Sequence, residues 1–122
     1  MSPINFDLLQ AEYPEYAASW AALREWFSRN WRKRYVELSV LLRSLRKLDK
    51  VEMILAIHTM VEMGMLKIAY RVKSPSGDLL EGDFDRPDVI PPELPNRDSS
   101  ELVKTDESDI VSGYRWELAD AA

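Results

Sequence analysis

The stretch VEMILAIHTMVEMGMLKIAYRV, residues 51–72, contains a helix, its end and a strand in one continuous run. Asp49 stands just before it as a typical N-cap, and apolar residues then recur at helical spacing on nearly every side. Gly64 suits the left-handed position that ends many helices. Beyond it, apolar and polar residues alternate from Leu66 to Lys73, which is typical of a half-buried strand. We therefore expect a helix that ends near Gly64 and a strand directly after it.

Two further helices are predicted upstream of this stretch. The first starts at Pro14, and its apolar side chains are spaced four, three and four residues apart at Tyr16, Trp20, Leu23 and Phe27. The second runs from Tyr35 to Leu48 and places five leucines on one face and basic residues on the others. Residues 28–35 contain no Gly or Pro, so one continuous helix through residue 47 remains an open alternative.

The start of the chain, SPINFDLLQ, predicts a short helical turn. Ser2 is the expected N-cap and Pro3 the expected first helical residue, where a missing N–H costs nothing. We expect Phe6 and Leu9 to pack this turn onto the core as a lid.

The residues after the first strand predict a hairpin and an extended segment. The turn SPSGD leads to a short strand over residues 79–84, which we expect to pair antiparallel with the first strand. Prolines between residues 85 and 100 exclude a helix or a central strand, so this segment should run extended over the surface. The alternation in YRWEL, residues 114–118, predicts a third strand.

Charge is distributed unevenly along the 122 residues, whose net charge is −5. Residues 29–47 hold seven basic residues and one acidic residue, a net of +6. Residues 76–122 hold four basic and thirteen acidic residues, a net of −9. One hypothesis is that the acidic tail covers the basic segment and suppresses nonspecific contact with nucleic acids.

This order of elements resembles the winged-helix variant of the helix-turn-helix superfamily. The residues that carry the resemblance are 51–72, in which a helix passes through a glycine into the first strand of a wing, followed by a hairpin with SPSG at its tip. The resemblance implies an α+β fold: a three-helix winged-helix-like domain with a small antiparallel β wing and an extended acidic C-terminal segment. We accordingly expect a core with its wing over residues 1–84 and a proline-rich acidic extension over residues 85–122 that packs back on it.

A second resemblance concerns the tail. SPSG at residues 74–77 and PNRDS at residues 95–99 are similar to the two knuckles of a zinc ribbon appended to some winged helices. The chain has no cysteine, so a tail of this kind would be a metal-free relative that holds no structural zinc of the usual four-ligand type.

Winged helices serve as DNA readers, RNA binders and protein-docking modules. A DNA reader needs Arg, Lys, Asn or Gln on the exposed face of its third helix, whereas this face is expected to present Glu52, Ala56, Thr59 and Met63. We therefore expect a noncatalytic protein-interaction or adaptor module that works as a subunit of a larger assembly. The alternative is a DNA-binding or other nucleic-acid-binding regulator that contacts phosphates through residues 29–47.

Two sets of residues are the candidate contacts. Basic side chains for an acidic partner or for nucleic acid are Arg29, Arg32, Lys33, Arg34, Arg43, Arg46 and Lys47. Large apolar side chains for a protein interface, hetero or self-associating, are Trp26, Trp31, Met53, Ile57, Met60 and Met63.

Other classes of function are not expected. The single histidine, His58, is expected to be a packed or boundary residue, and no nucleophile constellation, phosphate loop or metal motif accompanies it. We expect no enzyme activity, cofactor, metal or small-molecule substrate. The uncharged stretch Met53–Val61 is nine residues long, whereas a membrane span needs about 20. With no secretory signal at its start, the chain is expected to be cytoplasmic.

Overall fold

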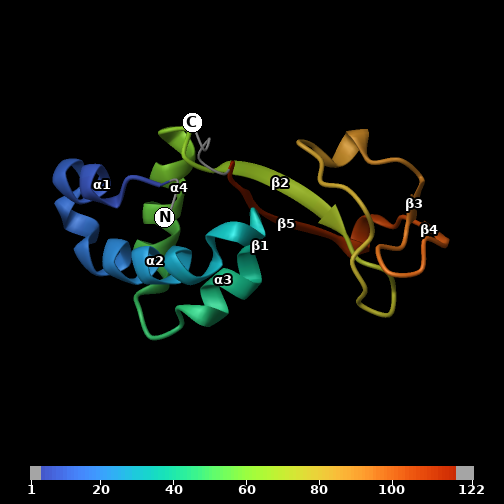
Figure 1. Cartoon of the computed structure of the whole chain (residues 1–122), viewed down its shortest axis with the longest axis horizontal. Helices are drawn as coiled ribbons and strands as arrows, with labels where there is room; N and C mark the ends of the chain where they lie inside the picture. Colours follow the sequence, from blue (N-terminus) through green and yellow to red (C-terminus); the bar gives the residue numbers. More distant parts are fainter. Residues whose placement is uncertain (1–3, 118–122) are drawn as a thin grey trace. The chain divides into compact units, whose positions relative to one another are not determined.

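The chain combines helices with short antiparallel strands, as expected for an α+β protein. A computed structural model describes residues 4–117. The helical elements and first strand are α1 (Phe6–Glu12), η1 (Pro14–Tyr16), α2 (Ala17–Asn30), η2 (Trp31–Lys33), β1 (Tyr35–Glu37), α3 (Leu38–Ser44) and α4 (Lys50–Glu62) (Figure 1). They are followed by β2 (Lys67–Val72), η3 (Pro87–Val89), β3 (Glu93–Pro95), β4 (Leu102–Lys104), η4 (Glu107–Asp109) and β5 (Ile110–Arg115).

The chain divides into two compact units. Unit 1 comprises the residues up to Lys67 and those from Arg115 onward, and unit 2 comprises Ile68–Tyr114. The division falls at the start of the first long strand, and the expected core over residues 1–84 with an extension over residues 85–122 stays a prediction. One sheet has the strand order β1-β5-β2, and a second sheet consists of β3 and β4.

The core of unit 1 forms where α2 packs against α4. Side chains from both helices are almost completely buried, and the residues concerned are Trp20, Leu23, Phe27, Met53, Ile57 and Met60. Phe6 and Leu9 of α1 are also buried, which confirms the predicted lid. The lid contacts α2 through Phe6, whose ring centroid lies 5.9 Å from that of Phe27.

The lid helix begins later than expected. Asn5 is its N-cap, because the side-chain oxygen of Asn5 accepts a 3.0 Å hydrogen bond from the backbone N–H of Leu8. The predicted cap Ser2 and first residue Pro3 lie outside the described residues.

The alternative of one continuous helix through residue 47 is wrong. The helix α2 ends at Asn30, and Arg34 adopts a left-handed conformation with φ of 63°, which no α-helix accommodates. The predicted helix over residues 35–48 is also shortened, because its first three residues form β1 and its last helical residue is Ser44. At the C-terminal end, the N–H of Leu45 is shared between the carbonyls of Leu41 and Leu42, a tightening typical of a helix terminus.

The third helix matches its prediction at both ends. The carboxylate of Asp49 accepts hydrogen bonds from the N–H groups of Val51 (2.9 Å) and Glu52 (3.1 Å), as an N-cap does. Gly64 has φ of +76° and follows the C-cap Met63, which confirms the left-handed helix end.

Unit 2 begins with the predicted hairpin. The backbones of Tyr70 and Phe84 exchange two hydrogen bonds of 2.7 and 2.8 Å, which confirms antiparallel pairing. The returning segment makes only isolated bridges, however, because Gly82 (φ of +96°) interrupts it as an extended strand.

The core of unit 2 is small and apolar. Val72, Leu80 and Leu94 are buried, and they are surrounded by the partly buried Phe84, Ile90, Val103 and Ile110. The extended proline segment contributes to this core through β3, whose Leu94 pairs with Val103 of β4. The predicted third strand is present as β5, but it starts four residues earlier than the expected Tyr114, at Ile110.

The N-cap of α4 provides a test of unit 1. We expect Asp49→Ala to lower the free energy of unfolding by about 1 kcal/mol, because two N–H groups at the start of α4 lose their acceptor. Urea denaturation followed by circular dichroism measures the change. Asp98→Ala, which removes the same charge from an exposed side chain without hydrogen bonds to described residues, should change stability far less; equal losses would contradict the capping role.

Tyr114 provides a test of unit 2. Burial raises the pKa of its phenol above 10.0, so the folded state holds the proton more tightly than the unfolded state. The contribution of Tyr114 to the free energy of unfolding is therefore fully present below about pH 10 and is lost as the pH rises through the pKa of the folded state. Denaturation from pH 8 to 11 should therefore give a steeper alkaline loss for the wild type than for Tyr114→Phe. Parallel curves would contradict this assignment.

Candidate functional site

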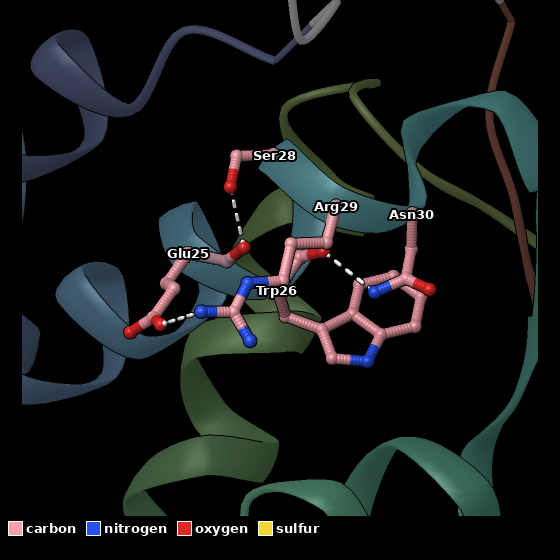
Figure 2. Close-up of polar contacts among 5 residues, drawn as sticks. All are labelled: Glu25, Trp26, Ser28, Arg29 and Asn30. Atoms are coloured by element: carbon pink, nitrogen blue, oxygen red, sulfur yellow. Dashed lines mark hydrogen bonds and ion pairs between the residues drawn. The ribbon is translucent and has the colours of Figure 1, made fainter.

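Near the C-terminal end of α2, polar side chains form hydrogen bonds with other groups of the same helix. Figure 2 shows the guanidinium of Arg29 donating to the carboxylate of Glu25 at 2.7 Å and the amide of Asn30 donating to the carbonyl of Trp26 at 2.8 Å. The hydroxyl of Ser28 donates to the carbonyl of Glu25 at 2.6 Å. The charge of Arg29 is thus matched locally, so this residue supplies less free positive charge than the sequence indicates.

Trp26 is fixed by aromatic contacts. Its ring lies edge-on to Phe27, with centroids 5.0 Å apart, and edge-on to Trp116, with centroids 6.0 Å apart. In Figure 2 the indole and the guanidinium of Arg29 extend away from each other. Within residues 4–117, the indole N–H of Trp26 has no hydrogen-bond acceptor, and the half-buried ring lines a pocket of about 330 Å³.

Three pockets of unit 1 share lining residues and are therefore neighbours on its surface. The pocket beside Trp26 shares Ala22, Ser44 and Leu45 with a second pocket of about 400 Å³. The second shares Leu45 and Leu48 with a third of about 270 Å³. We call this surface the α2–α3 groove. Its apolar lining consists of Ala22, Trp26, Leu42, Leu45, Leu48 and Met53.

Basic side chains line the same groove. Besides Arg29, these are Arg43, Arg46, Lys47 and Lys50. In the described part of the chain, none of these last four is paired with a carboxylate. Among the lining residues that the structure describes, the one acidic residue is Glu25, which is already bound to Arg29. The groove therefore offers apolar surface bordered by unneutralised positive charge, and such a surface attracts negatively charged partners.

The predicted basic set is divided by the structure. Arg29, Arg43, Arg46 and Lys47 line the α2–α3 groove, whereas Arg32, Lys33 and Arg34 do not. These last three are exposed in and after η2, and the guanidinium of Arg32 lies 5.0 Å from the centre of the Trp31 ring. The sequence did not separate these groups, because the turn after Asn30 carries no Gly or Pro to mark it.

The predicted apolar contact row requires a correction. Met53, Ile57 and Met60 are at most 1% exposed and Met63 is half-buried, so this row forms the core of unit 1 rather than a free surface. The exposed apolar side chains of α4 are Val51, Ile54 and Leu55. Because α4 is apolar on nearly all sides, helical periodicity alone did not decide which row faces α2.

The structure also locates the other residues named from the sequence, Trp26, Trp31 and His58. Trp26 lines the groove, but Trp31 does not; its carbonyl accepts a 2.7 Å hydrogen bond from the indole of Trp116. His58, expected to be a packed or boundary residue, has a side chain that is 62% exposed and contacts Glu62 at 3.1 Å.

The sequence did not single out Leu45 and Leu48 as surface residues. Their spacing continues the leucine face of the preceding helix, which predicted burial in the core. The helix ends at Ser44, however, so both side chains leave that face and become half-buried walls of the groove. A glycine or proline at residue 45 would have marked this end in the sequence.

Comparison with known proteins found no match: no family model, no curated protein and no solved structure resembles the chain significantly. Among residues 4–117, no three acidic or histidine side chains come together in a way that would hold a metal ion. No helix in that range combines the length and the apolar composition needed to cross a bilayer.

Trp26 in α2 and Trp116, which packs against the end of α2, differ in their hydrogen bonds, and this difference can be tested. Trp116 is buried and its indole donates to Trp31, so Trp116→Phe should cost about 1–3 kcal/mol because the carbonyl of Trp31 loses its donor. Trp26→Phe is the matched control, since the indole N–H it removes has no acceptor among the described residues. Urea denaturation should rank Trp116→Phe as clearly less stable. The reverse order would contradict the hydrogen-bond assignment.

Proposed function

We propose that the chain is a noncatalytic protein-interaction module that binds an acidic, amphipathic segment of a partner protein in the α2–α3 groove. It would act as an adaptor within a larger assembly. The observation that carries this proposal is the combination of an apolar lining with four unpaired basic side chains in one groove. Apolar anchors supply most of the affinity at such surfaces, and charge steers the partner and sets its orientation.

In this proposal the groove receives side chains that project from one face of a helix. Its three adjoining pockets would each receive one apolar side chain, as in complexes where an amphipathic helix lies in a groove. Acidic residues on the flanks of that helix would then meet Arg43, Arg46 and Lys47. The indole N–H of Trp26 would gain an acceptor at one end.

The winged-helix relationship is part of the same proposal. The order of helices α2, α3 and α4 supports it, as does the end of α4 at Gly64, which leads into β2 and the antiparallel bridges of the returning segment. In such a module, α4 would be the helix that DNA readers insert into the major groove. Its exposed apolar residues Val51, Ile54 and Leu55 provide no hydrogen bonds to base edges, which favours docking of protein over this part of the helix.

The second candidate is binding of nucleic acid through its phosphates. It is favoured by the exposed run Arg32, Lys33 and Arg34 beside Trp31, which together could contact a backbone and stack on a base. This candidate leaves the apolar lining of the groove unused, and we therefore rank it second.

Fluorescence anisotropy tests the proposal directly. The probe is a labelled helical peptide with leucines at i, i+3, i+4 and i+7 and glutamates between them. We expect binding in about the micromolar range at about 50 mM salt, weakened but retained at about 200 mM salt because the apolar contacts remain. A peptide of the same composition with scattered leucines should bind at least about ten-fold more weakly.

Paired charge reversals locate the binding surface. Arg43→Glu with Arg46→Glu should weaken peptide binding at least about ten-fold, whereas Arg32→Glu with Lys33→Glu, an equal charge change outside the groove, should have a much smaller effect. Labelled duplex DNA is titrated in parallel. DNA binding that only the second pair abolishes, together with no peptide binding, would establish the nucleic-acid candidate and overturn the proposal.

A further inference from the structure

Unit 2 carries charge of the opposite sign to the groove. Residues 68–114 contain five basic and eleven acidic side chains, a net of −6. Most of the acidic residues are exposed. Asp106 is fully exposed and accepts hydrogen bonds from the backbone and side chain of Ser108, which lower the pKa of its carboxyl group. Unit 2 is therefore strongly acidic at neutral pH.

The hairpin of β3 and β4 adds an exposed apolar side chain to this acidic unit. Leu94 and Val103 pair across the hairpin and face the core of unit 2. Because side chains alternate along a strand, the neighbouring pairs Pro95–Leu102 and Glu93–Lys104 face the opposite side. Leu102 is 67% exposed, equal to Val51 and above the other exposed large apolar residues described.

Acidic side chains outnumber basic ones on this hairpin. Glu93, Asp98 and Glu101 are exposed, against Arg97 and Lys104. The turn itself is ordered by the side-chain oxygen of Asn96, which accepts from the N–H of Asp98 at 2.9 Å. The hairpin thus presents Leu102 as an exposed apolar anchor on an acidic unit; on the face of Leu102 itself, Glu93 and Lys104 carry one charge of each sign, so the acidic excess comes from the rest of unit 2.

We propose that the occupant of the α2–α3 groove is a second copy of this chain, which inserts Leu102 of its β3–β4 hairpin between the basic side chains of the groove. This inference rests on the proposed function, since it uses the same groove. Charge complementarity favours this partner, because unit 2 of one copy has a net charge of −6 and the groove of the other copy carries the unpaired Arg43, Arg46, Lys47 and Lys50. A second copy is always present at the same concentration as the groove.

The contact joins two different surfaces, so it is heterologous. A pair of copies leaves one groove and one hairpin free, and further copies add until a ring closes. Association should therefore increase steadily with concentration and should not stop at a symmetric dimer unless closure occurs. It should also weaken as salt screens the charges.

Sedimentation velocity of the full chain at about 50 mM salt, from about 10 to 500 µM, tests the inference. We expect the weight-average sedimentation coefficient to rise over this range and to fall at about 200 mM salt. Leu102→Ser should keep the chain monomeric. Val51→Ser is the matched control, because Val51 is equally exposed on α4, and it should leave association unchanged.

Mixing two defective variants gives the decisive result. Arg43→Glu with Arg46→Glu impairs the groove and leaves the hairpin intact, whereas Leu102→Ser with Glu101→Lys does the reverse. Each variant alone should be monomeric, and an equimolar mixture should form a 1:1 dimer that grows no further, since only one functional groove and one functional hairpin remain to pair. All four substitutions are at exposed positions, and circular dichroism confirms folding.

Several outcomes would overturn the inference. These are a wild-type chain that stays monomeric throughout the range, association that survives Leu102→Ser, and variants that do not complement on mixing. If the acidic peptide still binds the groove in that case, the proposed function stands and only the choice of a second copy as partner is wrong. If the peptide also fails to bind, the groove has no such role.

Discussion

The burial of Trp116 against the end of α2 is the interaction on which the arrangement of unit 1 depends. Its backbone N–H donates to the carbonyl of Arg34 at 3.0 Å, and its indole donates to the carbonyl of Trp31 at 2.7 Å. Its ring centroid lies 4.8 Å from that of Phe27. Trp116 therefore donates hydrogen bonds to two carbonyls of the turn after α2 and packs on Phe27, a fully buried residue of that helix.

This contact has consequences for the groove. The left-handed Arg34 lies in the segment that Trp116 binds, and it separates α2 from α3. Trp26 is held edge-on by the same indole, so its position at one end of the groove follows from the packing of Trp116. Because α3 ends at Ser44, Leu45 and Leu48 line the groove instead of continuing the expected core face of the helix. The end of α3 at Ser44 thus leaves half-buried apolar side chains between exposed basic ones.

The sequence predicted those features that have local causes. The N-cap Asp49, the helix end at Gly64 and the alternating strand β2 each depend on neighbours within a few positions. The lid residues Phe6 and Leu9 were predicted from the local pattern of a short helical turn, although Phe6 packs on the distant Phe27. Features that depend on distant residues were not predictable in this way. At the break between α2 and α3, the carbonyl of Arg34 accepts a hydrogen bond from Trp116, which is more than eighty positions away. No sequence pattern between Asn30 and Tyr35 predicts this break. The same holds for the buried row of α4, because which side of an apolar helix is buried is decided by its partner α2.

The candidate site was predictable in charge but not in shape. The basic segment is visible in the sequence, whereas its division into groove residues and turn residues requires the ends of α2 and α3. This division bears on function through a simple physical difference. A phosphate backbone gains from cations alone and gains nothing from an apolar lining, whereas a protein segment gains from both. In the groove, Arg43 and Arg46 lie beside Leu45 and Leu48, so only an occupant with apolar and acidic groups together would satisfy all four side chains.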